Sequence, residues 1–133
     1  MFINTSVFVA SVNRSDKNHK GGKALIERAL KGEHGVAYTS DYVIDKSITT
    51  ALARTHNFDA ALKIGSLKVE TMRIEKIFTG PEEFQASWRK FQKFDKKPLS
   101  FTDCVSLTLM EIHGIDKIIS FDSAFDGLIT RIQ

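Results

Sequence analysis

Three short stretches, far apart in the chain, each end an apolar run with small polar or acidic side chains. They are residues 2–6, 99–103 and 118–126. Polar residues that follow buried parallel strands meet at the carboxyl edge of the sheet, where open α/β folds bind their ligands. Helical patterns alternate with short apolar segments along the chain, which predicts an α/β sandwich with a mostly parallel sheet. This one feature therefore predicts both a fold class and the edge at which a site should lie.

Start and stop signals divide the chain into alternating strands and helices. We expect strands at residues 1–3, 36–38, 71–78, 117–121 and 128–132, and helices at 4–12, 18–31, 40–54, 58–68, from 81 onward and at 101–113. Ser100 is expected to cap the last of these helices, and Gly114 to end it. This order of elements is typical of a single α/β domain over residues 1–133 with no internal repeat.

The composition limits the class of protein further. Hydrophobic residues make up 42% and charged residues 26% of the 133 positions, which is typical of a folded domain. The single cysteine, Cys104, excludes an internal disulfide and fits a reducing compartment. No apolar run approaches the ~20 residues that a membrane-spanning helix needs. Because no signal-peptide pattern opens the chain, we expect a cytoplasmic protein without a membrane partner.

Three polar residues at the expected sheet edge are candidates for chemistry, namely Asn4, Asp103 and Asp122. Each has a purely structural alternative. Asn4 and Asp122 can cap turns, and Asp103 stands three residues after Ser100, where a capping box places its acid. Capping, however, does not require all three to follow neighbouring strands. Convergent carboxylates bind Mg²⁺ or Mn²⁺, which prefer oxygen ligands and activate water for phosphodiester hydrolysis. The set therefore favours a hard-cation site that acts on phosphates.

Four blocks of the sequence, in order, resemble the PIN-domain family. The blocks are residues 2–10 (FINTSVFVA), 39–46 (TSDYVIDK), 99–104 (LSFTDC) and 119–126 (ISFDSAFD). They span essentially the whole chain, and the most similar members are VapC-type toxins of prokaryotic toxin–antitoxin pairs. The resemblance implies a three-layer α/β/α sandwich with a mostly parallel sheet and Mg²⁺- or Mn²⁺-dependent cleavage of RNA. It also implies frequent homodimers and an antitoxin protein that occupies the active cleft.

The resemblance assigns the catalytic positions to Asn4, Lys46, Asp103 and Asp122, and the metal ligands to Asp103, Asp122 and Asp126. The family pattern has an aspartate where this chain has Asn4 and a glutamate where it has Lys46. An ammonium roughly 5 Å from a divalent ion is repelled by about 2 kcal/mol in bulk water and by about 7 kcal/mol at an effective dielectric near 20. We therefore expect a weakened or disabled ribonuclease site.

These two exchanges leave several interpretations open. The chain could be a weakened ribonuclease that holds its metal with Asp103, Asp122 and waters, or a non-catalytic module that binds RNA or an antitoxin. The exchanges could also be engineered, since an active toxin harms its host. The Lys46 side chain could swing toward solvent, or its ammonium could occupy the place of the cation. A phosphatase of the haloacid-dehalogenase kind is disfavoured, because it needs an aspartate nucleophile after its first strand.

Two basic clusters and one aromatic stripe have structural as well as functional interpretations. The clusters are Arg89, Lys90, Lys93, Lys96 and Lys97, and Arg14, Lys17, His19, Lys20 and Lys23. We expect each to be a solvated helix face, with a rim that contacts RNA phosphates as the alternative. The stripe of Phe84, Trp88 and Phe91 is expected in the core, with a homodimer interface as the alternative.

Overall fold

The computed structural model describes residues 1–67 and 72–133. Its strands are β1 (Phe2–Ile3), β2 (Ala37–Ser40), β3 (Ile74–Ile77), β4 (Lys117–Ile119) and β5 (Thr130–Ile132). Its helices are α1 (Thr5–Val12), α2 (His19–Leu30), α3 (Asp41–Thr55), α4 (Phe58–Gly65), α5 (Pro81–Lys93) and α6 (Phe101–Ile112), and a 3₁₀ turn covers Ser123–Phe125. Every strand and helix expected from the sequence is present. The predictions at residues 68 and 71 lie outside the described part of the chain.

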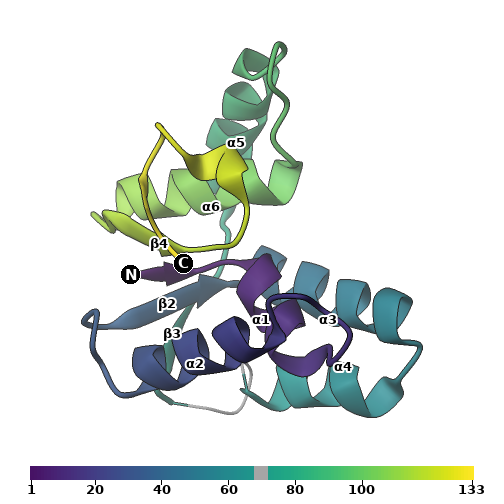
Figure 1. Cartoon of the computed structure of the whole chain (residues 1–133). Coiled ribbons are helices and arrows are strands. Elements are labelled where there is room, and N and C mark those ends of the chain that lie inside the picture. The colour runs from purple at the N-terminus through teal and green to yellow at the C-terminus, as the bar shows by residue number, and fades with distance from the viewer. Residues whose placement is uncertain (68–71) are drawn as a thin grey trace.

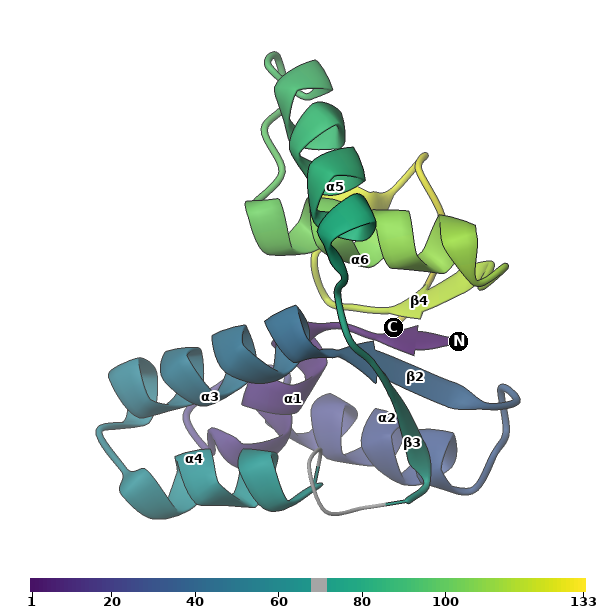
Figure 2. The same ribbon diagram turned by 180° about the vertical axis from the view of Figure 1, so that it is seen from behind.

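The five strands form one sheet in the order β3-β2-β1-β4-β5, and each neighbouring pair is parallel. Figure 1 and Figure 2 show α5 and α6 on one side of this sheet and α1, α2 and α4 on the other, with α3 running outward from the end of β2. The expected three-layer α/β/α sandwich is confirmed. Because the strands are parallel, all their carboxyl ends lie along one edge.

Strands β1 and β4 lie at the centre of the sheet and are covered on both faces. Phe2, Ile3, Ile118 and Ile119 are completely buried, as is Phe125 from the 3₁₀ turn. Parallel strands covered on both faces are near-continuous apolar runs, which is why they stand out in the sequence. Burying each such side chain contributes about 1.5–3 kcal/mol. The residues that directly follow these strands are therefore anchored to the buried centre of the sheet.

The expectation that the aromatic stripe of α5 lies in the core is wrong. Phe84 is 42% and Trp88 48% exposed. Phe84 packs edge-on against Phe101 of α6 with ring centroids 5.3 Å apart, and Trp88 stacks on Phe91 at 5.7 Å. Figure 1 shows the reason, since α5 extends away from the sheet and contacts the rest of the molecule mainly through α6. The aromatic pattern reflects packing on one neighbouring helix and not burial between layers.

Among the described residues, no helix combines the length and the apolar character needed to cross a lipid bilayer.

Candidate active site

One pocket at the carboxyl edge of the sheet brings together four of the five predicted site residues. We call it the β-edge pocket, and it has a volume of about 160 Å³. Its lining comprises Asn4, Thr5, Ser6, Val9, Lys46, Thr50, Arg54, Asp103 and Asp122. These residues come from the start of α1, one face of α3, the first turn of α6 and the segment after β4. Side chains separated by more than a hundred positions in sequence thus face one small cavity.

Asn4 is held by the strands β1 and β4 that it follows. Its backbone N–H donates to the carbonyl of Ile119 at 3.0 Å, and its Nδ2 donates to Ser120 Oγ at 3.2 Å. The Ser120 hydroxyl also accepts from the backbone N–H of Asp122 at 3.0 Å and lies 3.3 Å from Ser6 Oγ. The carbonyl oxygen Asn4 Oδ1 is buried and has no hydrogen-bond partner among the described residues. Asn4 therefore lines the pocket with a side chain held by Ser120, and its unpaired Oδ1 is buried beneath the surface.

Asp122 caps the 3₁₀ turn and lines the pocket at the same time. Its Oδ1 accepts from the backbone N–H of Ala124 at 2.9 Å, as the structural alternative required. Its side chain is exposed, so one carboxylate oxygen can serve the turn while the group remains accessible from the pocket. Capping and a place in the pocket are therefore compatible.

Lys46 and Asp103 are joined through the cap of α6. Ser100 Oγ accepts from the backbone N–H of Asp103 at 3.0 Å, and Asp103 Oδ2 accepts from the backbone N–H of Ser100 at 3.4 Å, which completes the expected capping box. Lys46 Nζ donates to the same Ser100 Oγ at 3.0 Å. The Lys46 side chain thus points into the pocket, and not toward solvent.

Two opposing effects act on the negative charge of the Asp103 carboxylate in this pocket. This residue is only 6% exposed. Burial raises the pKa of its carboxyl, the neighbouring Asp122 carboxylate adds to that effect, and the Lys46 ammonium and the hydrogen bonds with Ser100 oppose it. The net result is a pKa above the ordinary value. Lys46 is therefore the main positive charge that stabilises ionised Asp103.

The structure places the Asp126 side chain apart from the other predicted site residues. Its carboxylate forms a two-pronged ion pair with Arg131, with Oδ1–Nε and Oδ2–Nη2 distances of 2.6 and 3.0 Å, and this pairing lowers the pKa of Asp126. Asp126 does not line the β-edge pocket. A turn with Gly127 at a φ of 82° brings Arg131 back onto Asp126, which spacing in the sequence does not reveal.

Sequence reasoning missed two residues of the site, Ser120 and Arg54. Ser120 is the hub of the Asn4 hydrogen bonds, and its signal is its place directly after the buried pair Ile118–Ile119. Arg54 follows Lys46 and Thr50 at successive intervals of four residues, so the three lie on one face of α3 and line the pocket together. This spacing could have been read from the sequence.

The oxygen donors of the pocket are the type that a hard divalent cation prefers. They are the carboxylates of Asp103 and Asp122, with the buried and unpaired Asn4 Oδ1 on a third lining residue. Within residues 1–67 and 72–133, however, no three His, Cys, Asp or Glu side chains are grouped closely enough to hold a metal ion. The same lining carries the cations Lys46 and Arg54. The pocket thus offers the type of ligand atom that Mg²⁺ or Mn²⁺ prefers, but its positively charged side chains repel such a cation.

A parallel α/β/α sandwich with acids at this edge matches a known class. The family model described as PIN domain matches residues 1–128, so the chain belongs to the PIN-domain family. The resemblance to VapC-type members is confirmed by a relative and by a solved structure. The 23S rRNA-specific endonuclease VapC20 of Mycobacterium tuberculosis, from strains CDC 1551 and H37Rv, is 28% identical over 128 residues. The match covers 96% of this chain and 92% of VapC20.

A solved structure supports the same fold. The crystal structure of Mycobacterium tuberculosis VapC20, described as a sarcin-ricin loop cleaving toxin, superposes with a TM-score of 0.84 at 23% identity. The superposition covers 96% of this chain and 93% of that chain.

Proposed function

We propose that this protein is a VapC-like endoribonuclease toxin whose phosphodiester-cleaving site is weakened by Asn4 and Lys46. The observation that carries the proposal is the β-edge pocket, in which Asp103, Asp122 and Asn4 line one cavity at the carboxyl edge of a parallel sheet. The name of the relative, a 23S rRNA-specific endonuclease, supports RNA as the substrate class. Membership of the PIN-domain family supports a divalent cation as cofactor.

Three residues of this chain would hold Mg²⁺ or Mn²⁺, namely Asp103, Asp122 and Asn4. A bound divalent cation supplies Lewis-acid stabilisation of phosphate charge and lowers the pKa of a water molecule. Arg54, at the far end of the pocket lining, is placed to pair with a substrate phosphate.

Lys46 is the residue that weakens the site. Its ammonium hydrogen-bonds Ser100 and is the main positive charge acting on Asp103, so it competes with any cation that the carboxylate binds. Repulsion of about 2 kcal/mol, the lower limit at roughly 5 Å, already reduces cation affinity more than tenfold. Asn4 adds to the loss because an amide oxygen carries no full charge.

The same contact favours one alternative, a non-catalytic module that binds RNA or an antitoxin protein. With Lys46 hydrogen-bonded to Ser100 and its charge acting on Asp103, the pocket is compensated internally and needs no metal to be stable. RNA and a cognate antitoxin remain the proposed partners in either case. The exposed Phe84 and Trp88 on α5 support the further proposal of a homodimer, which light scattering at several protein concentrations would test. We also propose that the protein is located in the cytoplasm.

The deciding experiment reverts both exchanges. We expect the Asn4→Asp, Lys46→Glu double variant to cleave 23S rRNA in the presence of Mg²⁺ or Mn²⁺ at least tenfold faster than the natural chain. Adding Asp103→Asn to the double variant is the matched control, and it should abolish the gained cleavage. If the folded double variant neither cleaves RNA nor binds Mn²⁺, the endonuclease proposal fails. If it binds RNA without cleaving it, the non-catalytic module is the better description.

A further inference from the structure

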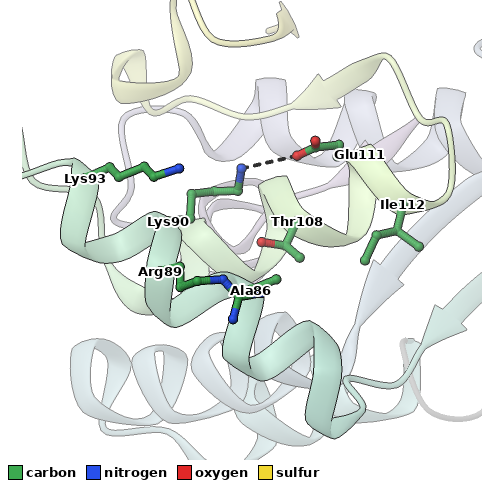
Figure 3. Close-up of a pocket in the computed structure, with 7 residues that line it drawn as sticks. All are labelled: Ala86, Arg89, Lys90, Lys93, Thr108, Glu111 and Ile112. Carbon is green, nitrogen blue, oxygen red and sulfur yellow. Dashed lines mark hydrogen bonds and ion pairs between the residues drawn. The ribbon is translucent and has the colours of Figure 1, made fainter.

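A second cavity lies between α5 and α6, outside the β-edge pocket. We call it the α5–α6 groove, and it has a volume of about 280 Å³. Its lining comprises Ala86, Arg89, Lys90 and Lys93 of α5 and Thr108, Glu111 and Ile112 of α6 (Figure 3). None of these residues lines the β-edge pocket.

The groove carries an excess of positive charge. Lys90 Nζ forms an ion pair with Glu111 Oε2 at 3.2 Å, so these two charges offset each other. Arg89 and Lys93 have no carboxylate partner among the described residues. They are four residues apart on α5, which puts them on the same face of the helix. Two uncompensated cations therefore line one hollow.

Thr108 adds an unsatisfied hydrogen-bonding group to this hollow. The residue is only 3% exposed, and its hydroxyl has no partner among the residues that the structure describes. Helical serine and threonine hydroxyls commonly bond the carbonyl four residues earlier. Ser106 of the same helix does so, donating to the carbonyl of Thr102 at 3.1 Å. Figure 3 shows the Thr108 hydroxyl pointing instead from α6 toward Lys90 and Arg89.

We propose that the α5–α6 groove binds a phosphate group of the RNA backbone through Arg89, Lys93 and the Thr108 hydroxyl. Guanidinium, ammonium and hydroxyl donors are the groups that commonly contact nucleic-acid phosphates. The long side chains of Arg89 and Lys90 can shift to let a ligand oxygen reach Thr108. This inference rests on the proposed function for its choice of RNA as the source of the phosphate.

The position of the groove suits a contact away from the cleaved bond. Helix α6 contributes Asp103 to the β-edge pocket and Thr108 to the groove. These residues are separated by about 7.5 Å along the helix axis, at 1.5 Å per residue. At 100° per residue they also point about 140° apart around the axis, so an RNA held in the groove would pass around α6 to reach the pocket. The contact would add affinity and orientation without sequence information, as phosphate contacts do.

The main experiment measures RNA binding in the presence of EDTA, so that cleavage does not interfere. A labelled oligouridylate should bind the Arg89→Gln, Lys93→Gln double variant about tenfold more weakly than the natural chain. The slope of log affinity against log salt should fall by about 0.7, because one single-strand phosphate contact is lost. The matched control is Lys31→Gln with Lys117→Gln, which removes the same charge from exposed positions outside both cavities. Equal losses in both double variants would overturn the proposal.

The Thr108→Val variant distinguishes a loss of RNA binding from a loss of folding stability. Valine keeps the shape and removes the unpaired hydroxyl, so the melting temperature should stay equal or rise while RNA affinity falls about threefold. A fall in melting temperature with unchanged RNA affinity would overturn the role of Thr108. Titration with inorganic phosphate, followed by amide chemical shifts of residues 86–93 and 108–112, distinguishes free phosphate from RNA as the source. Phosphate binding there without any loss of RNA affinity in the variants would contradict the RNA assignment.

The two proposals fail in different ways. If the Asn4→Asp, Lys46→Glu variant cleaves no RNA while the groove variants still lose RNA affinity, the endonuclease proposal fails and the groove stands. If cleavage appears but the groove variants bind RNA as tightly as the natural chain, the groove proposal fails alone. Preferential binding of an acidic peptide such as polyglutamate, with no response to RNA, would also overturn it.

Discussion

The β-edge pocket and the α5–α6 groove share helix α6, yet they hold charge in different ways. In the pocket, two acids face two cations, and Lys46, Ser100 and Asp103 form a connected set of short contacts. In the groove, three cations face one acid, and two of those cations lack a carboxylate partner within the described residues. The positive and negative charges of the pocket balance each other, whereas the groove has two unpaired positive charges that can bind an anionic ligand.

The difference shows how two exchanges can change the use of a site without changing its architecture. Asn4 and Lys46 remove two negative charges from the family pattern, but both remain in the pocket and are held by hydrogen bonds. The pocket therefore keeps its shape while it loses attraction for cations. The groove depends on long exposed side chains, so changes there should alter binding and leave stability almost untouched.

The largest difference between the two regions should be in stability. Ile119 is completely buried at the end of β4, directly before Ser120, and Ile119→Ala should lower the free energy of unfolding by about 2–5 kcal/mol. Ile112 lines the groove and is 55% exposed, so Ile112→Ala should cost less than about 0.5 kcal/mol. Urea unfolding of both variants checks this. Similar losses would mean that the groove is as rigidly built as the pocket.

A smaller loss is expected when the polar network of the pocket is broken. Ser120→Ala removes the partner of Asn4 Nδ2, of the Asp122 backbone N–H and of Ser6 Oγ. Ser6 Oγ keeps the backbone N–H of Phe121 as a donor, but the buried Asn4 Nδ2 would be left unpaired, which should destabilise the protein by about 1–3 kcal/mol. The comparison is Thr108→Val in the groove, where the hydroxyl is already unpaired and no loss is expected. Thermal unfolding of both variants would show whether the network contributes as described.

The pH dependence of stability gives a sharper test of Asp103. Because burial raises the pKa of Asp103 in the folded state, the folded protein binds the proton more tightly than the unfolded chain does, and ionisation above that pKa costs stability. Asp103→Asn should therefore raise the melting temperature by about 2–5 °C at neutral pH. The gain should disappear as the pH falls below the ordinary value of 3.8. A gain that is constant across this range would contradict the assigned pKa direction.

The smallest effect is expected at Asp126, outside both cavities. Its ion pair with Arg131 lowers the pKa of this carboxyl, so the pair stabilises the fold above the ordinary value and loses this effect as the pH falls through the lowered pKa. Asp126→Asn should be slightly less stable than the natural chain at neutral pH and equal to it in strong acid. Melting curves at several pH values check this. A large loss of Mn²⁺ affinity in this variant would instead restore Asp126 as a metal ligand.

The sequence predicts the elements and the pocket well because both depend on local signals. Strand β4 and the Ser100–Asp103 capping box are short patterns with strong physical causes, and their positions follow from parallel strands. The aromatic stripe of α5 was misplaced because periodicity shows that one face packs, but not how many layers cover it. The Arg131 pairing of Asp126 and the free hydroxyl of Thr108 depend on tertiary geometry, which no local pattern contains.

The central claim is that Asp103 and Asp122 form a divalent-cation site that Lys46 opposes. Calorimetric titration with Mn²⁺ tests it directly in three proteins: the natural chain, Lys46→Gln, and Lys46→Gln with Asp103→Asn. The account predicts that Lys46→Gln binds Mn²⁺ at least tenfold more tightly than the natural chain, and that adding Asp103→Asn abolishes this gain. Equal Mn²⁺ affinities in the natural chain and Lys46→Gln, or tight binding that survives the loss of Asp103, would contradict it.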